Sequence, residues 1–137
     1  METKFNSQIC TTREQSERLL ALGLKKETAD MIYRSYGYII DEWGNKEQKF
    51  KTPQVVNDWM GQYDIPAWSL ARIVELMPQS IEYEGNTLYL TIYAGDVFYT
   101  NWKEHTPLAR TLDLYKHLIW YIEWLIKEGY FNKEYLV

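Results

Sequence analysis

The chain has 137 residues, of which 46% are hydrophobic and 25% are charged. These values are ordinary for a globular protein and exclude a disordered or fibrous chain. The length suits one domain with its own core, so we expect a single domain over residues 1–137. A formal net charge of −4 disfavours binding to nucleic acid, because the sign is wrong for a phosphate backbone.

The one cysteine, Cys10, cannot form an internal disulfide, as is typical of proteins from a reducing compartment. No apolar run reaches the ~20 residues of a membrane span, and the first residues lack the layout of a signal peptide. We therefore expect a cytoplasmic protein without membrane contacts. The six Trp and twelve Tyr residues exceed what a core of this size needs. Some of these rings are expected at the surface or in a groove.

Two short helices are expected in the first quarter of the chain. Thr11 or Thr12 can cap the first, because each has Glu or Gln three residues later, and this helix would end near Leu22. A second helical stretch is expected over 26–35, before Gly37.

A strand and a charged hairpin arm are expected next. Tyr38, Ile39 and Ile40 are aromatic or β-branched, which favours a strand, and residues 41–45 are rich in turn formers. The stretch 45–51 has three lysines against one glutamate, which is too short for a nucleic-acid patch. We interpret it as the solvated arm of a hairpin.

The segment 52–68 is aromatic and irregular, with a short helical turn expected near 55–60. A helix then runs from about residue 66 or 69 to 77, where Pro78 ends it. The clearest β pattern follows over about 81–100. A Gly-Asn pair between alternating runs predicts an antiparallel meander there.

The longest predicted element is a C-terminal helix over about 107–128. Thr106 can cap it, Pro107 suits its first position and Gly129 can end it. Its apolar residues cover about half of the circumference, so the helix should lie across the apolar face of the meander. The sequence thus predicts an α+β fold in which a small antiparallel sheet packs against this long helix, with shorter N-terminal and central helices.

Two aromatic groups are candidate binding residues. Trp120 and Trp124 lie on the polar side of the long helix, where either another segment covers them or they form an exposed pair that binds a partner protein or a second copy. Trp59, Tyr63 and Trp68 either line a groove for a peptide or flat ligand, together with Trp43 and Tyr36, or form a small core under their loop.

The chain lacks the common catalytic motifs, and no cofactor or metal is expected. The best catalytic candidates are Asp113 and His117, four residues apart on the predicted helix, where a carboxylate would orient an imidazole for acid–base chemistry or a metal. An ordinary surface contact is the alternative. Cys10 and Ser69 lie near no evident base, so we expect an inert thiol and a helix-start residue. His105 is expected to bond locally in its loop.

Two parts of the sequence resemble a known family. They are DIPAWSL at 64–70 with LMP at 76–78, and TPL at 106–108 with WLIKEG at 124–129. They resemble small uncharacterised proteins encoded by gut anaerobic bacteria and by their phages or mobile elements, which share an IPAWSL segment, a short hairpin and a closing helix that starts TP and ends WL-x-x-x-G. The resemblance spans roughly 11–130 and implies this layout and a phage or mobile-element origin, without an activity.

We therefore expect a non-enzymatic accessory factor of a phage or mobile element that binds another protein, or itself, through exposed aromatic residues. The alternative is a small-ligand binder or enzyme that uses the aromatic loop 59–68 or the pair of Asp113 and His117.

Overall fold

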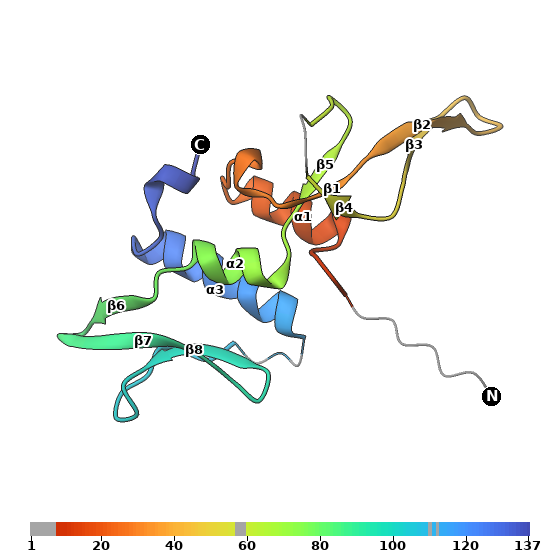
Figure 1. Cartoon of the computed structure of the whole chain (residues 1–137). Helices are drawn as coiled ribbons and strands as arrows, with labels where there is room; N and C mark the ends of the chain where they lie inside the picture. Colours follow the sequence, from red (N-terminus) through yellow and green to blue (C-terminus); the bar gives the residue numbers. More distant parts are fainter. Residues whose placement is uncertain (1–7, 57–59, 110, 112) are drawn as a thin grey trace, which may run out of the picture.

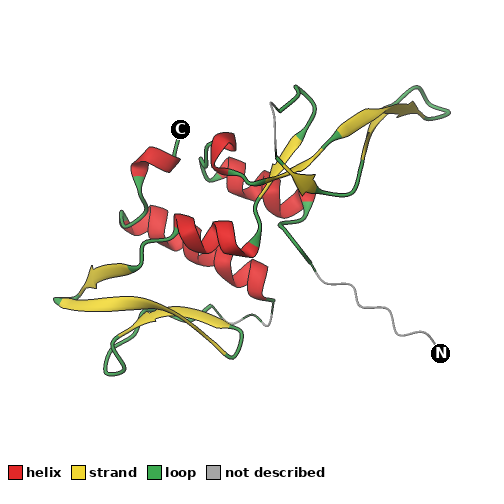
Figure 2. Cartoon of the chain, in the orientation of Figure 1, coloured by secondary structure: helices red, strands yellow, loops and turns green. Residues whose placement is uncertain are grey.

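The computed structural model describes residues 8–56, 60–109, 111 and 113–137, and their arrangement is an α+β fold, as predicted (Figure 1, Figure 2). The helices are α1 (Arg13–Ala21), α2 (Leu70–Leu76) and α3 (Leu114–Glu128), with 3-10 turns at Lys26–Thr28 and Lys133–Tyr135. The strands are β1 (Met31–Tyr33), β2 (Ser35–Ile40), β3 (Lys46–Phe50), β4 (Gln54–Val55), β5 (Ile65–Ala67), β6 (Ser80–Tyr83), β7 (Asn86–Tyr93) and β8 (Asp96–Thr100). They pair antiparallel in three small sheets, of order β4-β1-β5, β2-β3 and β6-β7-β8. None of the helices in the described ranges is long and apolar enough to cross a membrane.

The meander β6-β7-β8 packs against α3, and both features were predicted. Ile81 of β6 stands opposite Leu88 of β7, and the inner face of the sheet meets the helices that lie above it in Figure 1. Leu88 belongs to the same buried cluster as Ile122 and Leu125 of α3. Burial of each such side chain contributes roughly 1.5–3 kcal/mol, so this layer is a main source of stability.

The start of α3 differs from the prediction, because the helix begins at Leu114 and not near residue 107. Asp113 is the N-cap, and its carboxylate accepts an N–H of the first turn at 3.2 Å. The predicted cap, Thr106, has another role. Its buried hydroxyl accepts the N–H of Tyr99 at 3.0 Å and bonds to the hydroxyl of Tyr121. Thr106 therefore ties the loop to β8, and the helix starts only after this contact.

Three predicted helix ends are confirmed, those at Thr12, Ser69 and Gly129. Thr12 and Gln15 form a complete capping box on α1, with hydrogen bonds of 3.1 and 3.0 Å. Ser69 caps α2 by accepting a backbone N–H at 3.2 Å. Gly129 ends α3 at a φ of 82°, in the left-handed region where glycine meets no steric penalty.

The helix predicted over 26–35 is wrong, since only Lys26–Thr28 form a 3-10 turn and Met31–Tyr33 form β1. β1 is a central strand that pairs with β4 on one side and with β5 on the other. Met31 and Ile32 are buried there. Pairing on both sides gives the N–H and C=O groups of β1 hydrogen-bond partners. This pairing outweighs the helical preference of the residues around β1. The short helical turn predicted near 55–60 does not start at Val55, because Val55 belongs to β4. Residues 57–59 of this prediction lie outside the described residues.

Segments far apart in sequence meet beside α1. Arg18 of α1 forms a 2.6 Å ion pair with Glu123 of α3, across a separation of 105 residues. Leu19 is fully buried in the cluster that α3 also fills. The N–H of Val137 donates to the carbonyl of Gly23 at 2.8 Å. The first described helix is thus held by the last one and by the residues that follow it.

Candidate functional site

A hairpin arm projects from the rest of the fold, at the upper right of Figure 1. We define it as β2, β3 and the turn between them, residues 35–50. The carboxylate of Asp41 holds the turn by accepting the N–H groups of Trp43 at 2.9 Å and Asn45 at 2.8 Å. The pKa of the Asp41 carboxyl is lowered below its ordinary value, mainly by the hydrogen bond from the backbone N–H of Asn45. The strand, the turn and the solvated arm predicted from the sequence are confirmed.

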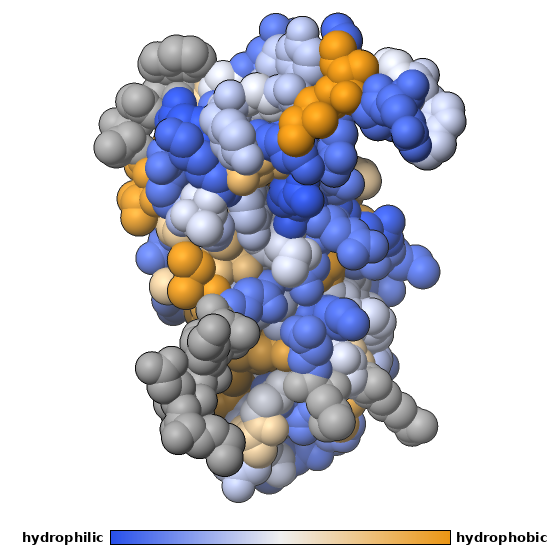
Figure 3. All heavy atoms as spheres, turned by 90° about the vertical axis from the view of Figure 1, so that its right-hand side faces the viewer, coloured by the Kyte–Doolittle hydropathy of each residue, from blue (hydrophilic) through white to orange (hydrophobic). Residues whose placement is uncertain are grey.

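The arm exposes a group of large apolar side chains. More than half of each is exposed, with values of 61% for Tyr36, 53% for Tyr38, 54% for Ile39, 55% for Ile40 and 77% for Trp43. Figure 3 views this end of the molecule face on and shows hydrophobic side chains gathered near the top among hydrophilic ones. Single exposed apolar residues are normal, but several gathered on one projecting hairpin are typical of an interaction surface.

The outer edge of β2 is open and carries no charge. Its sequence from Ser35 to Ile40 is SYGYII, whereas β3 carries Lys46, Glu47 and Lys49. β5 pairs with the chain only as far as Tyr33, so no described strand pairs with this edge of β2. Natural proteins usually protect open edges with charged residues, proline or bulges. β2 has a register shift at its base, between Ser35 and Gly37, and its outer part from Gly37 to Ile40 pairs regularly with β3. The uncharged open edge of this outer part is suited to the addition of another strand.

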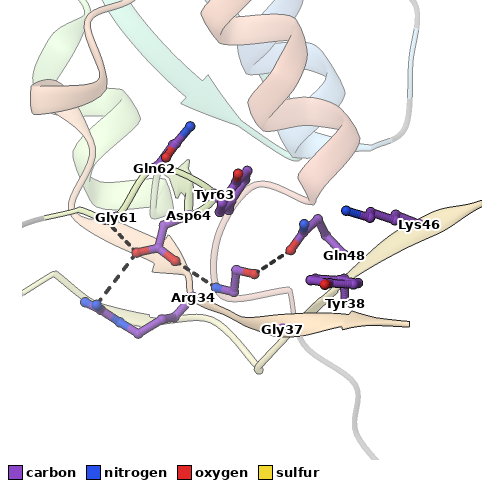
Figure 4. Close-up of a pocket in the computed structure, with 10 residues that line it drawn as sticks. Arg34, Gly37, Tyr38, Lys46, Gln48, Gly61, Gln62, Tyr63 and Asp64 are labelled. Atoms are coloured by element: carbon purple, nitrogen blue, oxygen red, sulfur yellow. Dashed lines mark hydrogen bonds and ion pairs between the residues drawn. The ribbon is translucent and has the colours of Figure 1, made fainter. Parts of the chain in front are cut away.

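A pocket of about 590 Å³ lies at the base of the arm, between the arm and the loop before β5 (Figure 4). Asp64 joins the two parts, because its carboxylate accepts the N–H groups of Ser35 and Gly61, each at 2.7 Å, and lies 3.6 Å from the Arg34 guanidinium. The hydroxyl of Ser35 bonds to the side chain of Gln48 at 2.9 Å. These contacts fix the pocket floor, so Asp64 has a structural role.

Aromatic rings and a cation form the rest of the lining. Tyr38 and Tyr63 both line the pocket, and 59% of Tyr63 is exposed. The ammonium of Lys46 lies 4.9 Å from the centroid of the Tyr38 ring, which is a cation–π distance. This arrangement can bind a flat or extended group. Lys46 offers it a positive charge, and the Arg34 guanidinium, which pairs with Asp64, lines the same pocket.

The predicted pair of Asp113 and His117 is not formed by their side chains. Asp113 caps α3 with its carboxylate. His117 is fully buried, so it does not form the ordinary surface contact given as the alternative, and its Nδ1 lies 3.9 Å from a carboxylate oxygen of Asp96, the first residue of β8. Among the described residues neither ring nitrogen has a hydrogen-bond partner. The geometry therefore supports neither an oriented base nor a metal centre, and no group of three metal-ligating side chains occurs in the described ranges.

The predicted aromatic binding residues separate into exposed and buried ones. Trp68 is a core residue, since it is fully buried and its indole N–H donates to Thr28 at 3.0 Å, so it cannot line a ligand groove. Tyr63 lies at the pocket, and Trp59 lies outside the described residues. On α3, Trp124 is half-buried and stacks on Tyr130 with ring centroids 5.7 Å apart. Trp120 is 37% exposed.

The other nucleophiles and histidine have local roles. Cys10 is buried, and this burial raises the pKa of its thiol, which makes the thiolate scarce. Ser69 caps α2 and donates its hydroxyl to Asp30 at 2.5 Å. His105 bonds to the carbonyl of Thr106 at 2.8 Å.

Sequence reasoning missed most of the arm surface. It proposed Tyr36 and Trp43 only as partners of the aromatic loop, and it assigned Tyr38, Ile39 and Ile40 to a strand without a binding role. The pattern that would have indicated them is a six-residue β-prone run without any charge beside a strong turn.

Comparisons with known protein families, with curated proteins and with solved structures find no match.

Proposed function

We propose that this chain is a non-enzymatic protein-interaction factor that binds another polypeptide through the hairpin arm. We further propose, from the resemblance of its IPAWSL segment and closing helix, that it serves as an accessory factor of a phage or mobile element. The observation that supports binding is the open, uncharged edge of β2 together with its exposed apolar side chains. Backbone groups along such an edge supply affinity, and alternate side chains supply specificity.

The arm is a better candidate than the surface of α3. Trp124 is partly covered by the rings of Tyr83 and Tyr130, with centroids 5.9 and 5.7 Å away. Trp120 exposes 37% of its surface, whereas Trp43 at the tip of the arm exposes 77%. Anchors that dominate binding are aromatic side chains able to enter a partner's pocket, and Trp43 fits this role.

Site-specific photo-crosslinking tests this function. Tyr38 is replaced by a photoreactive benzophenone amino acid in cells that express the full chain, and Tyr89 serves as the matched control. Both are tyrosines in strands, with 53% and 56% of their surface exposed, but Tyr89 lies on the meander. We expect a discrete polypeptide adduct from position 38 and none from position 89. Equal, diffuse labelling from both positions would contradict the proposal.

A second candidate function is the binding of a small ligand in the pocket at the base of the arm. The observation that favours it is the combination of Tyr38 and Tyr63 with Lys46 on one lining. A flat anionic ligand would stack on a ring and meet the ammonium. A thermal-shift screen of aromatic carboxylates and nucleotides tests it, with Tyr63→Ala as the variant that should abolish any shift. If no compound shifts the parent's midpoint, this candidate fails.

A further inference from the structure

We infer that the polypeptide that binds the β2 edge is a second copy of this chain, paired antiparallel to β2 about a twofold axis. This inference rests on the proposed function and names its partner.

The backbone of β2 points alternately toward β3 and toward the open edge. In an antiparallel pair only every second residue exchanges hydrogen bonds with the neighbouring strand. At the end of the arm the N–H of Asp41 donates to the carbonyl of Asn45 at 2.9 Å. Counting back by twos, Ile39 and Gly37 point toward β3, opposite Glu47 and Lys49. Tyr38 and Ile40 therefore direct their N–H and C=O groups to the open edge.

The regular part of the open edge runs from Gly37 to Ile40. The N–H of Ser35 is already bonded to Asp64, the pairing of β2 with β3 shifts register between Ser35 and Gly37, and the turn starts after Ile40. A second β2 laid antiparallel along it, with Tyr38 opposite its own copy at the axis, covers this part. Tyr36, at the register shift, then lies beside the partner's Ile40. The partner's Trp43 then falls beside the pocket at the base of the arm.

The side chains of the edge are complementary to themselves in this register. Aromatic and β-branched residues make favourable cross-strand pairs, and the register brings Tyr36 and Ile40 together twice. On the opposite face Gly37 has open space around its Cα, so the partner's Ile39 meets no side chain there. The exposed parts of the arm residues and Trp43 amount to on the order of 500 Å² per protomer. Covering them would remove about 1,000 Å² from water in total, which is the size of a weak or transient interface.

Charge limits the assembly to two copies. The segment 35–40 contains no charged side chain, so two copies of β2 bring no like charges together. β3 forms the outer edge of the resulting four-stranded sheet, and its Lys46, Glu47 and Lys49 protect that edge from further pairing. A twofold contact of this kind is closed, and it gives a dimer without polymers. With an interface of this size, we expect a Kd on the order of micromolar.

Disulfide trapping and mass measurement test this inference on the full chain. Residues at a hydrogen-bonded antiparallel position have Cα atoms about 5.5 Å apart, within the range that a disulfide bridges. Tyr38→Cys should therefore oxidise to a covalent dimer at least tenfold faster than the control Tyr89→Cys. Cys10 is buried and should not interfere. The parent should show a concentration-dependent rise toward twice its mass in sedimentation equilibrium.

Two proline variants separate loss of the dimer from loss of the hairpin. Ile40→Pro removes an N–H that only the second copy would use, so it should give a folded monomer. Ile39→Pro removes an N–H directed to β3 and should disrupt the arm itself. If the parent stays monomeric and Tyr38→Cys oxidises no faster than Tyr89→Cys, the inference is overturned. The same holds if Ile40→Pro still dimerises. If the dimer fails these tests but position 38 gives a photo-adduct with a different polypeptide, the proposed function still stands. If position 38 gives no photo-adduct at all, both the proposed function and the dimer are contradicted.

Discussion

His117 provides a sharp stability test, because its ring is fully buried without a hydrogen-bond partner among the described residues. The 3.9 Å separation from Asp96 is too long for a hydrogen bond. A buried neutral imidazole left without a hydrogen-bond partner for its donor and its acceptor costs at least about 2–3 kcal/mol. Replacement by an apolar side chain of similar volume removes this cost and introduces a packing mismatch of less than about 1.5 kcal/mol.

We therefore expect His117→Leu to stabilise the protein by about 1–3 kcal/mol. The measurement is urea unfolding followed by far-UV circular dichroism, where the midpoint should rise with an unchanged slope. His105→Leu is the matched control at the chain's other histidine, which is exposed, and it should change stability by less than about 0.5 kcal/mol. A loss of more than about 1 kcal/mol in His117→Leu would refute the reasoning, since it would mean that the imidazole is hydrogen-bonded in solution.

Three further predictions test the core, the start of α3 and the loop that precedes it. Ile119→Asp should lower the free energy of unfolding by several kcal/mol, because Ile119 is 7% exposed and an unpaired carboxylate would be buried; a melting curve like that of the parent would show that α3 is not central. Asp113→Ala should cost about 1 kcal/mol in urea unfolding through loss of the N-cap, and Asp113→Asn, which keeps the capping oxygen, should cost less. Burial raises the pKa of Tyr121 to about 12 from an ordinary value of 10.0, so the folded state holds this proton more tightly than the unfolded state. Stability should therefore fall as the pH rises from 10 toward 12, and Tyr121→Phe should weaken this dependence in unfolding measured across that range.

The elements that depend on neighbouring residues were predictable. The capping box of Thr12 and Gln15, the cap at Ser69 and the glycine end at Gly129 each involve residues within one turn of the helix they bound. The meander was equally local, because its hairpins connect consecutive strands. The contacts that form these elements are between residues close in sequence, so the sequence pattern is sufficient to predict them.

The errors arose where distant segments decide the structure. β1 is a strand because β5, more than thirty residues later, pairs with it through Met31 opposite Ala67. α3 starts late because the Thr106 hydroxyl bonds to the backbone of Tyr99 and to the side chain of Tyr121, and it does not cap the start of the helix. No local pattern contains these contacts, so helix periodicity alone placed both boundaries wrongly.

The candidate site was predictable only in part for the same reason. The turn around Asp41 and the charged strand after it follow from local residue types. That the other edge of β2 is open depends on where β5 begins, at Ile65 opposite Tyr33. The pocket could not be predicted from local residues either, because Asp64, which closes it, comes from a different part of the chain.

The contact between α1 and α3 has a consequence for the order in which the protein can fold during synthesis. Arg18 and Glu123 are 105 residues apart, and a ribosome takes roughly 5–20 s to add that many residues. During this time α1 exists without the surface that buries Leu19 in the finished protein. The newly made N-terminal half therefore presents an apolar stripe to the cell before its own partner helix exists. This interval is when a chaperone, or aggregation, would compete with folding.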